Sequence, residues 1–267
     1  LVGSEMCIRD SLNGNQTALM FVYYLITRWK ELGKINGKEY IVKTIVTTET
    51  IKTIAERNGV EMYDVYTGFK WIANVMRENE GKKNYIGGGE ESYGFLCEDF
   101  VRDKDAVSAC VILAEIAAWA KDQGLSLYQL LQKIYVEYGF SKEKGISVVK
   151  KGKSGAEEIE AMMKKFRENP LTEIAGSKVT YFYDYSTLKG KDYAENETVT
   201  LDMPTTSNVL QYFTEDNTKV SIRPSGTEPK IKFYCEVHSK VKSIDELPEA
   251  EKAAEEKINQ IKASLGI

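Results

Sequence analysis

The sequence contains one histidine, five prolines, four scattered cysteines and no long apolar run. A single histidine leaves little room for a His-based catalytic triad or a His-rich zinc site. The cysteines form no Cys-x-x-Cys pair, which predicts reduced thiols and a cytoplasmic location. The most apolar stretch, residues 18–26, is far shorter than the roughly 20 residues that cross a bilayer. We therefore expect no membrane partner. Lysine and arginine (36) do not exceed aspartate and glutamate (40), so we expect no nucleic-acid partner either.

The composition is that of a globular protein, with 42% hydrophobic and 28% charged residues in 267 positions. This length predicts one large domain or two ordinary ones. Residues 1–11 show neither helical nor strand periodicity, and they resemble a translated sequencing adaptor; an ordinary loop remnant is the alternative. We therefore leave residues 1–11 out of the fold prediction. If they are an artefact, part of the protein is missing upstream.

Residues 12–140 alternate between amphipathic and β-branched segments. Helices are predicted at 15–33, 49–58, 69–79, 105–121 and 126–138, and strands at 40–46, 61–66 and 84–86. Helices and strands that alternate with short connections predict a layered α/β domain with a mainly parallel sheet.

The pattern changes after Gly139. Residues 141–154 are rich in lysine, glycine and serine, which predicts a linker. In residues 155–267, helices at 155–169 and 245–265 flank strands at 178–185, 208–214, 219–222 and 230–237. This order predicts a smaller α+β domain, with an antiparallel sheet and helices on one face.

The first candidate site is Gly87-Gly88-Gly89-Glu90-Glu91-Ser92-Tyr93-Gly94, directly after a predicted strand. Glycines allow the backbone to approach a ligand, and the carboxyl ends of strands are where open α/β sheets bind ligands. Two carboxylates and a hydroxyl could hydrogen-bond a polyol. From composition alone, a glycine-rich turn with solvated acids is equally consistent.

The second candidate site is Arg223-Pro224-Ser225-Gly226-Thr227-Glu228-Pro229, between two predicted strands. A guanidinium forks onto phosphate oxygens, hydroxyls add donors, and a glycine lets backbone N–H groups surround an anion. The alternative is a rigid hairpin with an exposed arginine. Alone, the loop favours a phosphate site only slightly.

Together, the two motifs resemble the sugar-recognition and phosphate-binding loops of the α-D-phosphohexomutases, in particular the phosphoglucomutase branch. Asn13-Gly14-Asn15-Gln16, Thr67-Gly68-Phe69-Lys70 and residues 100–105 add to the match in order. The resemblance extends from Leu12 to the C-terminus. It implies a four-domain enzyme, of which this chain is the third domain (12–140) and the fourth (155–267), with missing N-terminal domains of the same polypeptide as partners.

The resemblance also implies a reaction. Family members move a phosphoryl group between C1 and C6 of a hexose, here glucose 1-phosphate to glucose 6-phosphate, with glucose 1,6-bisphosphate as intermediate. A phosphoserine in the first domain and Mg²⁺ on an Asp-x-Asp-x-Asp loop in the second would carry the chemistry, so this chain should be inactive alone. Asp103-Lys104-Asp105 is the nearest run, but it has one aspartate too few, and we expect no metal ligands here.

Residue roles carried over by the resemblance fall into two sets. Glu90 and Ser92 would grip sugar hydroxyls, and Thr67 would line the same pocket. Lys104 would act as a general acid/base or as a static partner of a phosphate or carboxylate. The residues that would hold the non-transferring phosphate are Arg223, Ser225, Gly226 and Thr227.

Other functions stay open at this point. The two domains could form a non-catalytic sugar-phosphate-binding protein, or an interaction module without a ligand. The Gly-Glu-Glu-Ser loop favours a gluco-configured sugar, and mannose or pentose phosphates are the alternative substrates.

Overall fold

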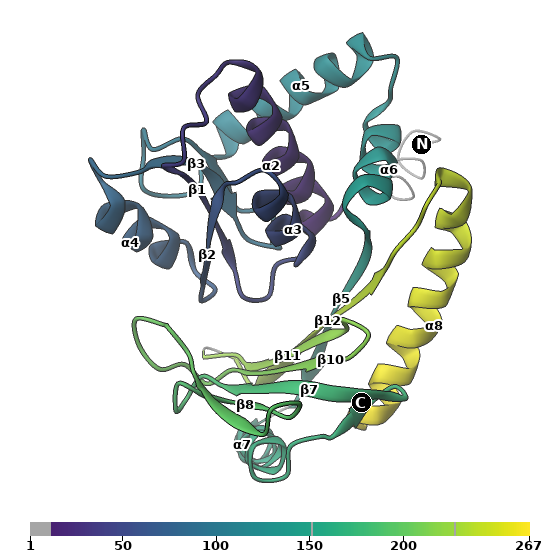
Figure 1. Ribbon diagram of the computed structural model, residues 1–267. Helices are drawn as coiled ribbons and strands as arrows, with labels where there is room; N and C mark the ends of the chain where they lie inside the picture. Colours follow the sequence, from purple (N-terminus) through teal and green to yellow (C-terminus); the bar gives the residue numbers. More distant parts are fainter. Residues whose placement is uncertain (1–11, 151, 227) are drawn as a thin grey trace. The chain divides into compact units, whose positions relative to one another are not determined.

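The computed structural model describes residues 12–150, 152–226 and 228–267 (Figure 1). The segment 1–11 therefore lies outside the described residues. The chain divides into two compact units, Leu1–Gly139 and Phe140–Ile267, which are described separately below.

The first unit alternates helices and strands as predicted. Its sheet has the strand order β2-β1-β3-β4, in which β1 pairs in parallel with β2 and β3, and β4 pairs antiparallel with β3. The elements are α2 (Gly14–Glu31), β1 (Glu39–Thr44), α3 (Thr50–Arg57), β2 (Glu61–Val65), α4 (Phe69–Asn79), β3 (Asn84–Gly89), β4 (Phe95–Cys97), α5 (Ala106–Asp122) and α6 (Leu127–Tyr138). The expected α/β class with a mainly parallel sheet is confirmed.

Side-chain caps fix where three of these helices begin. Asn13 and Gln16 form a reciprocal capping box at α2, and Ser126 and Gln129 form another at α6. The Asp105 carboxylate accepts hydrogen bonds from the backbone N–H groups of the first turn of α5. Each cap satisfies backbone donors that a helix start leaves without partners.

The second unit is built on an antiparallel sheet with the order β5-β12-β11-β10-β7-β8-β9, and β6 pairs with β7. Its strands are β5 (Phe140–Val149), β6 (Glu173–Ile174), β7 (Ser177–Asp184), β8 (Lys189–Asp192), β9 (Glu197–Thr200), β10 (Leu210–Thr214), β11 (Lys219–Pro224) and β12 (Lys230–Ser239). Helices α7 (Gly152–Glu168) and α8 (Leu247–Leu265) both pack against β12, and a short 3-10 turn, η1 (Ile244–Glu246), precedes α8. This is the expected α+β class.

The predicted linker at 141–154 is wrong. Residues 140–149 form β5, which pairs with β12 along its whole length, from Phe140 opposite Ser239 to Val149 opposite Lys230. Helix α7 then begins at Gly152, three residues before its predicted start. The Lys/Gly/Ser composition that suggested a linker is instead that of an edge strand, where charged side chains discourage pairing with other molecules.

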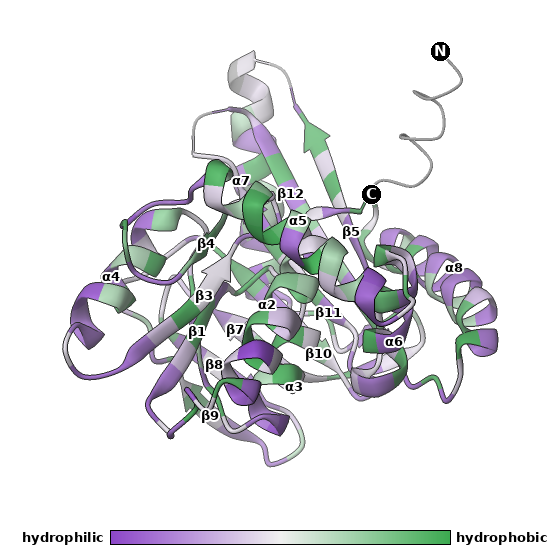
Figure 2. Ribbon diagram, turned by 90° about the horizontal axis from the view of Figure 1, so that it is seen from above, coloured by the Kyte–Doolittle hydropathy of each residue, from purple (hydrophilic) through white to green (hydrophobic). Residues whose placement is uncertain are grey.

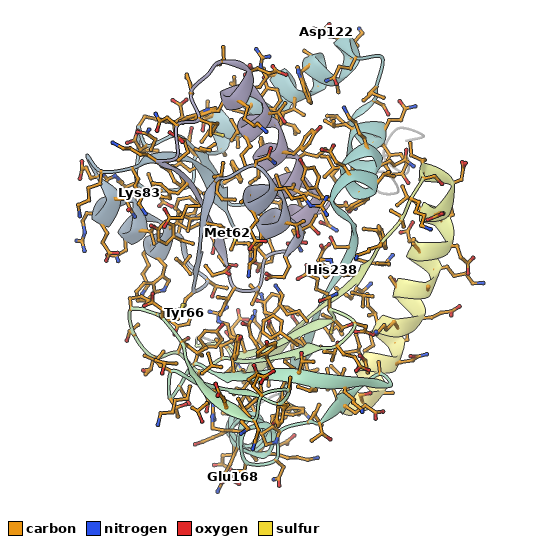
Figure 3. The ribbon with its side chains drawn as sticks, viewed as in Figure 1. Met62, Tyr66, Lys83, Asp122, Glu168 and His238 are labelled. Carbon is orange, nitrogen blue, oxygen red and sulfur yellow. The ribbon has the colours of Figure 1, made fainter. Side chains whose placement is uncertain are left out.

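The parallel strands of the first unit bring three loops to one edge of its sheet. Because β1, β2 and β3 run in the same direction, the segments after Thr44, Val65 and Gly89 leave from the same edge. Figure 3 shows Met62 within β2 and Tyr66 just beyond its end. This edge is where an open α/β sheet binds its ligands.

In the part of the chain that the structure describes, no helix has the length and apolarity to span a membrane.

Candidate functional site

The Gly-Glu-Glu-Ser motif is the turn of the β3–β4 hairpin. Gly89 pairs with Phe95, and the backbone N–H of Glu90 donates to the Gly94 carbonyl at 2.7 Å, which closes the turn. Glu90 is only 9% exposed. The motif therefore has a defined geometry at the carboxyl edge of the sheet.

Glu90 is held at the start of helix α4. Its Oε1 accepts a hydrogen bond from the backbone N–H of Gly68 at 2.7 Å. Gly68 precedes the first residue of α4 and has φ of 112°, a conformation that glycine adopts without strain. A helix start carries partial positive charge and unpaired backbone N–H groups, which attract a carboxylate oxygen. Since only Oε1 is used by this bond, Oε2 can accept from a ligand.

Lys104 and Glu90 converge at Gly94. A Cβ atom added to Gly94 would lie 3.1 Å from Lys104 Cδ and 3.2 Å from Glu90 Oε2. Lys104 Nζ lies 3.4 Å from Asp103 Oδ1 and 5.8 Å from the centroid of the Phe69 ring, and its side chain is 55% exposed. The absence of a side chain at Gly94 thus leaves room for the aliphatic part of Lys104 and for the Glu90 carboxylate on the same side of the turn.

Thr67 and Ser92 complete this group at the same edge. Thr67 is half-buried and directly precedes Gly68, the residue bonded to Glu90. Ser92 is exposed in the hairpin turn, beside Tyr93, whose hydroxyl donates to the Leu12 carbonyl at 3.1 Å. The first unit therefore brings together the four positions predicted in it: Thr67, Glu90, Ser92 and Lys104.

A buried lysine at this edge was missed by the sequence analysis. Lys43 in β1 is 1% exposed, and its Nζ donates to Asp64 Oδ1 at 2.7 Å and to Glu49 Oε1 at 2.9 Å. A buried ammonium requires such partners. The signal in the sequence is a lysine within the β-branched run 40–46, a run that otherwise predicts an ordinary buried strand.

The described residues of this chain provide no magnesium site. No group of three or more His, Cys, Asp or Glu side chains in the described ranges could hold a metal. Asp105 caps α5 through bonds to the N–H groups of Val107 and Ser108, and Asp103 Oδ1 accepts from the N–H of Lys104. The Asp-Lys-Asp run thus starts a helix, as the sequence predicted.

The Arg-Pro-Ser-Gly-Thr-Glu-Pro motif is the turn between β11 and β12. The N–H of Ser225 donates to the Lys230 carbonyl at 2.8 Å, and the N–H of Lys150 donates to the Pro229 carbonyl at 2.9 Å. Gly226 and Glu228 are exposed. Thr227, a predicted phosphate ligand, lies outside the described residues.

Two cations face each other at the base of this turn. Arg223 of β11 is the cross-strand partner of Lys232 of β12. Like charges directly opposite each other in an antiparallel pair destabilise it. Among the described residues, neither side chain forms an ion pair with a carboxylate. An anion between them would relieve the repulsion; Lys232 was missed because nothing in the sequence showed its register opposite Arg223.

A cavity of about 590 Å³ borders the same turn within the second unit. Its apolar wall comes from Ala156, Ile159 and Met163 of α7, and its other side from Asn208 and the turn itself. The residues of the turn that line it are Pro224, Ser225, Gly226, Glu228 and Pro229. The turn is thus bordered by open space on one side, as a binding loop requires.

Comparison with protein families matches both units. Residues 13–138 match the family described as phosphoglucomutase/phosphomannomutase, alpha/beta/alpha domain III, and residues 147–254 match its C-terminal domain. Among curated relatives, the phosphoglucomutase of Staphylococcus aureus (strain bovine RF122 / ET3-1) is 38% identical over 222 residues, 83% of this chain and 39% of the relative. That of Staphylococcus haemolyticus is 34% identical over 225 residues, 84% of this chain and 40% of the relative.

Solved structures show the same fold. The open form of pp63/parafusin, a phosphoglucomutase from Paramecium, has a TM-score of 0.55 at 17% identity, over 94% of this chain and 42% of that one. A phosphoglucomutase/phosphomannomutase family protein from Burkholderia thailandensis has a TM-score of 0.54 at 16% identity, over 95% and 42%. The chain thus spans about 40% of the length of these relatives.

Proposed function

Because the chain belongs to the phosphoglucomutase/phosphomannomutase family, we propose that it is the substrate-binding, C-terminal half of a phosphoglucomutase-like enzyme. The observation that carries the proposal is the Arg223–Lys232 pair, two facing cations at the base of a turn whose sequence resembles a phosphate loop. Such a pair costs stability unless an anion occupies it. A phosphosugar is the substrate class that supplies this anion.

The first unit binds the sugar in this proposal. Glu90 Oε2 accepts from sugar hydroxyls while Oε1 stays bonded to Gly68, so the carboxylate is already oriented before substrate arrives. Ser92 donates to or accepts from a neighbouring hydroxyl, and Thr67 lines the pocket. Lys104 either transfers a proton at the reacting oxygen or acts as a fixed positive charge.

The second unit binds the phosphate that is not transferred. Arg223 and Lys232 supply the charge. Ser225 and Thr227 supply hydroxyls, and backbone N–H donors come from the turn around Gly226. Holding this phosphate fixes the distant hydroxyl that must react, which converts binding energy into orientation. Substitution of Arg223 in the complete enzyme should therefore change both KM and kcat.

The parent enzyme interconverts glucose 1-phosphate and glucose 6-phosphate through glucose 1,6-bisphosphate. The phosphoryl donor, a phosphoserine, and the residues that hold Mg²⁺ belong to the upstream part of the polypeptide. Mg²⁺ supplies electrostatic stabilisation of the transferring phosphoryl group. This chain alone binds substrate but does not turn it over.

The proposed location is the cytoplasm, and it is supported by the free thiols of Cys97, Cys110 and Cys235 among the described residues. Glucose phosphates are the proposed substrates, because the curated relatives above are named phosphoglucomutases. Mannose or pentose phosphates are the alternative substrates within the same mechanism.

The coding sequence upstream of Leu12 tests the proposal directly. We expect it to encode a phosphoserine loop and an Asp-x-Asp-x-Asp loop in the same reading frame. Their absence, with a genuine start codon near Leu12, would instead support a non-catalytic sugar-phosphate-binding protein. A melting temperature that does not rise with glucose 6-phosphate would contradict both of these functions.

A further inference from the structure

Helix α5 has an exposed face that is unusually apolar. Val107 is 74% exposed and Val111 is 61% exposed. With 3.6 residues per turn, five exposed side chains fall within an arc of about 100°. They are Val107, Cys110, Val111, Ala114 and Ala118, and we call them the α5 outer face.

The opposite side of α5 is already used for packing. Ile116 and Ala120 are fully buried, and the helix packs on α2, where the Tyr24 hydroxyl donates to Glu115 Oε1 at 2.7 Å. Glu115 is the only charged residue in the first fifteen positions of α5. A surface helix normally carries charge on its outer side, whereas a helix that is apolar all round is buried in the complete protein.

Helix α8 shows what a solvated helix of this chain looks like. It buries Ala254, Ile258 and Ile261 on one side and exposes Glu251 and Lys252 on the other. Figure 2 shows more purple along α8 and green over much of α5. Helix α8 therefore does not share the apolar outer face of α5.

Two more apolar side chains are exposed a few residues before the helix. Phe100 is 60% exposed and Val101 is 40% exposed in the segment that leads into α5. Burying large apolar side chains is favourable, so a partner that covered these residues would be held mainly by the hydrophobic effect. Exposed apolar side chains that gather on one helix face, as on the α5 outer face, are typical of interaction sites.

We propose that the α5 outer face is the docking surface for the upstream part of the same polypeptide. The inference rests on the proposed function in one respect, namely that such a part exists. The curated relatives extend over more than twice the length that this chain matches, and the matched domains are named the third and the C-terminal one. Permanent interfaces are more hydrophobic than transient ones, so an apolar surface such as the α5 outer face favours a permanent partner.

The course of the chain places this upstream part beside α5. The Leu12 carbonyl accepts from the Tyr93 hydroxyl, and Tyr93 is adjacent to Gly94, which Lys104 approaches. Lys104 immediately precedes the cap of α5. Polypeptide that enters at Leu12 is therefore delivered near the N-terminal end of α5, whose other end is at Asp122 (Figure 3).

Cys110 provides a reporter within the outer face. We expect a water-soluble maleimide to label Cys110 rapidly in the 267-residue chain and at least tenfold more slowly in the complete polypeptide, as read by peptide mapping. Cys97 and Cys235 are internal controls, because burial raises the pKa of each thiol to about 12. Equal Cys110 rates in the chain and the complete polypeptide would overturn the proposal.

A charge placed on the face tests the same contact by a second route. Val111→Glu should leave the melting temperature of this chain unchanged, but in the complete polypeptide it should lower the melting temperature and restore Cys110 labelling. Val149→Glu is the matched control, since Val149 is 62% exposed, and it should leave Cys110 protected. Loss of protection in both variants would overturn the proposal.

Two further outcomes separate this proposal from others. If Cys110 of the chain alone becomes protected as its concentration rises, while the complete polypeptide leaves it reactive, the occupant is a second copy and the proposal is wrong. If the gene encodes no upstream part, the proposed function fails with it. If the upstream part exists and Cys110 stays reactive in the complete polypeptide, the docking proposal is wrong but the proposed function is unaffected.

Discussion

Removing the charge of Arg223 should raise the stability of the chain and lower its affinity for phosphosugar. Arg223→Gln keeps most of the side-chain length but abolishes the like-charge pairing with Lys232. Two unit charges about 6 Å apart in water repel by about 0.7 kcal/mol, and salt reduces this. For a unit of this size, we expect a rise of about 1–2 °C in melting temperature at low ionic strength.

The same substitution should weaken the binding of glucose 6-phosphate. A charge-assisted hydrogen bond contributes about 1.5–3 kcal/mol, which corresponds to a loss of roughly 10–150-fold in affinity. Isothermal titration of glucose 6-phosphate into the chain measures this loss, and glucose without phosphate is the negative control. Opposite signs for stability and affinity distinguish a binding residue from a structural one.

Arg167→Gln is the matched control. Arg167 lies in the same unit, but its Nε is 2.9 Å from Asp184 Oδ2 and its Nη2 donates to Asn208 Oδ1 at 2.8 Å. Its loss should lower the melting temperature and leave the affinity for glucose 6-phosphate unchanged. The reasoning is refuted if Arg223→Gln behaves like Arg167→Gln, or if it leaves the affinity unchanged.

Three further substitutions probe the first unit. In the complete enzyme, if Lys104 transfers a proton, Lys104→Ala should lower kcat by about 10²–10⁴-fold with little change in KM. Steady-state kinetics measure both constants, and a change in KM alone would assign Lys104 a purely electrostatic role. Gly94→Ala should weaken glucose 6-phosphate binding several-fold with little loss of stability, because the added Cβ would crowd Glu90 and Lys104. Gly145→Ala is the control, since a Cβ there meets nothing within 4 Å. It should change neither the affinity for glucose 6-phosphate nor the melting temperature. Glu39→Gln should destabilise the chain by about 1–3 kcal/mol at pH 7, as measured by urea unfolding.

The effect of Glu39→Gln should depend on pH in a defined direction. Burial alone would raise the pKa of Glu39, but hydrogen bonds from the N–H of Asn36, the Asn84 amide and the N–H groups of Gly37 and Lys38 lower it overall. A carboxyl with a lowered pKa stabilises the fold above its unfolded-state pKa of about 4.3. This contribution is lost as pH falls through the folded-state pKa. A difference from wild type that stays constant between pH 7 and pH 3 would argue against this role.

The periodicity of the sequence predicted most of the fold because local signals and tertiary packing agree. Helix α4 has its predicted bounds, Phe69–Asn79, and Asp105 caps α5 as its side-chain chemistry suggests. Short strands were missed: β4, β8 and β9 have only three or four residues each, too few to show alternation.

The failure at β5 has a different cause. Its burial alternates weakly, because it lies at the sheet edge and exposes Lys144 and Gly145 near its middle. Because strand alternation is weak there, the Lys/Gly/Ser composition of residues 141–154 favours the interpretation as a linker. Pairing with β12 over ten residues, a contact between segments about ninety positions apart, is what makes 140–149 a strand.

For the candidate sites, the motifs predicted positions but not partners. The sequence placed Glu90 after a strand, yet the Gly68 N–H that orients its carboxylate comes from another loop. Likewise, Lys232 faces Arg223 only because of the strand register, and Lys43 is surrounded by acids from two other segments. Such contacts depend on tertiary structure, and a single sequence does not encode them in any local pattern.

The most direct test of the account measures binding and turnover in one sample of the purified 267-residue chain. The chain is supplied with glucose 1-phosphate, glucose 1,6-bisphosphate and Mg²⁺, and formation of glucose 6-phosphate is followed by a coupled dehydrogenase assay. We expect glucose 6-phosphate to bind and to raise the melting temperature of the chain, while no product forms above the uncatalysed rate. Appreciable mutase turnover by this chain alone would contradict the claim that it binds the substrate while the upstream part carries the phosphoryl chemistry.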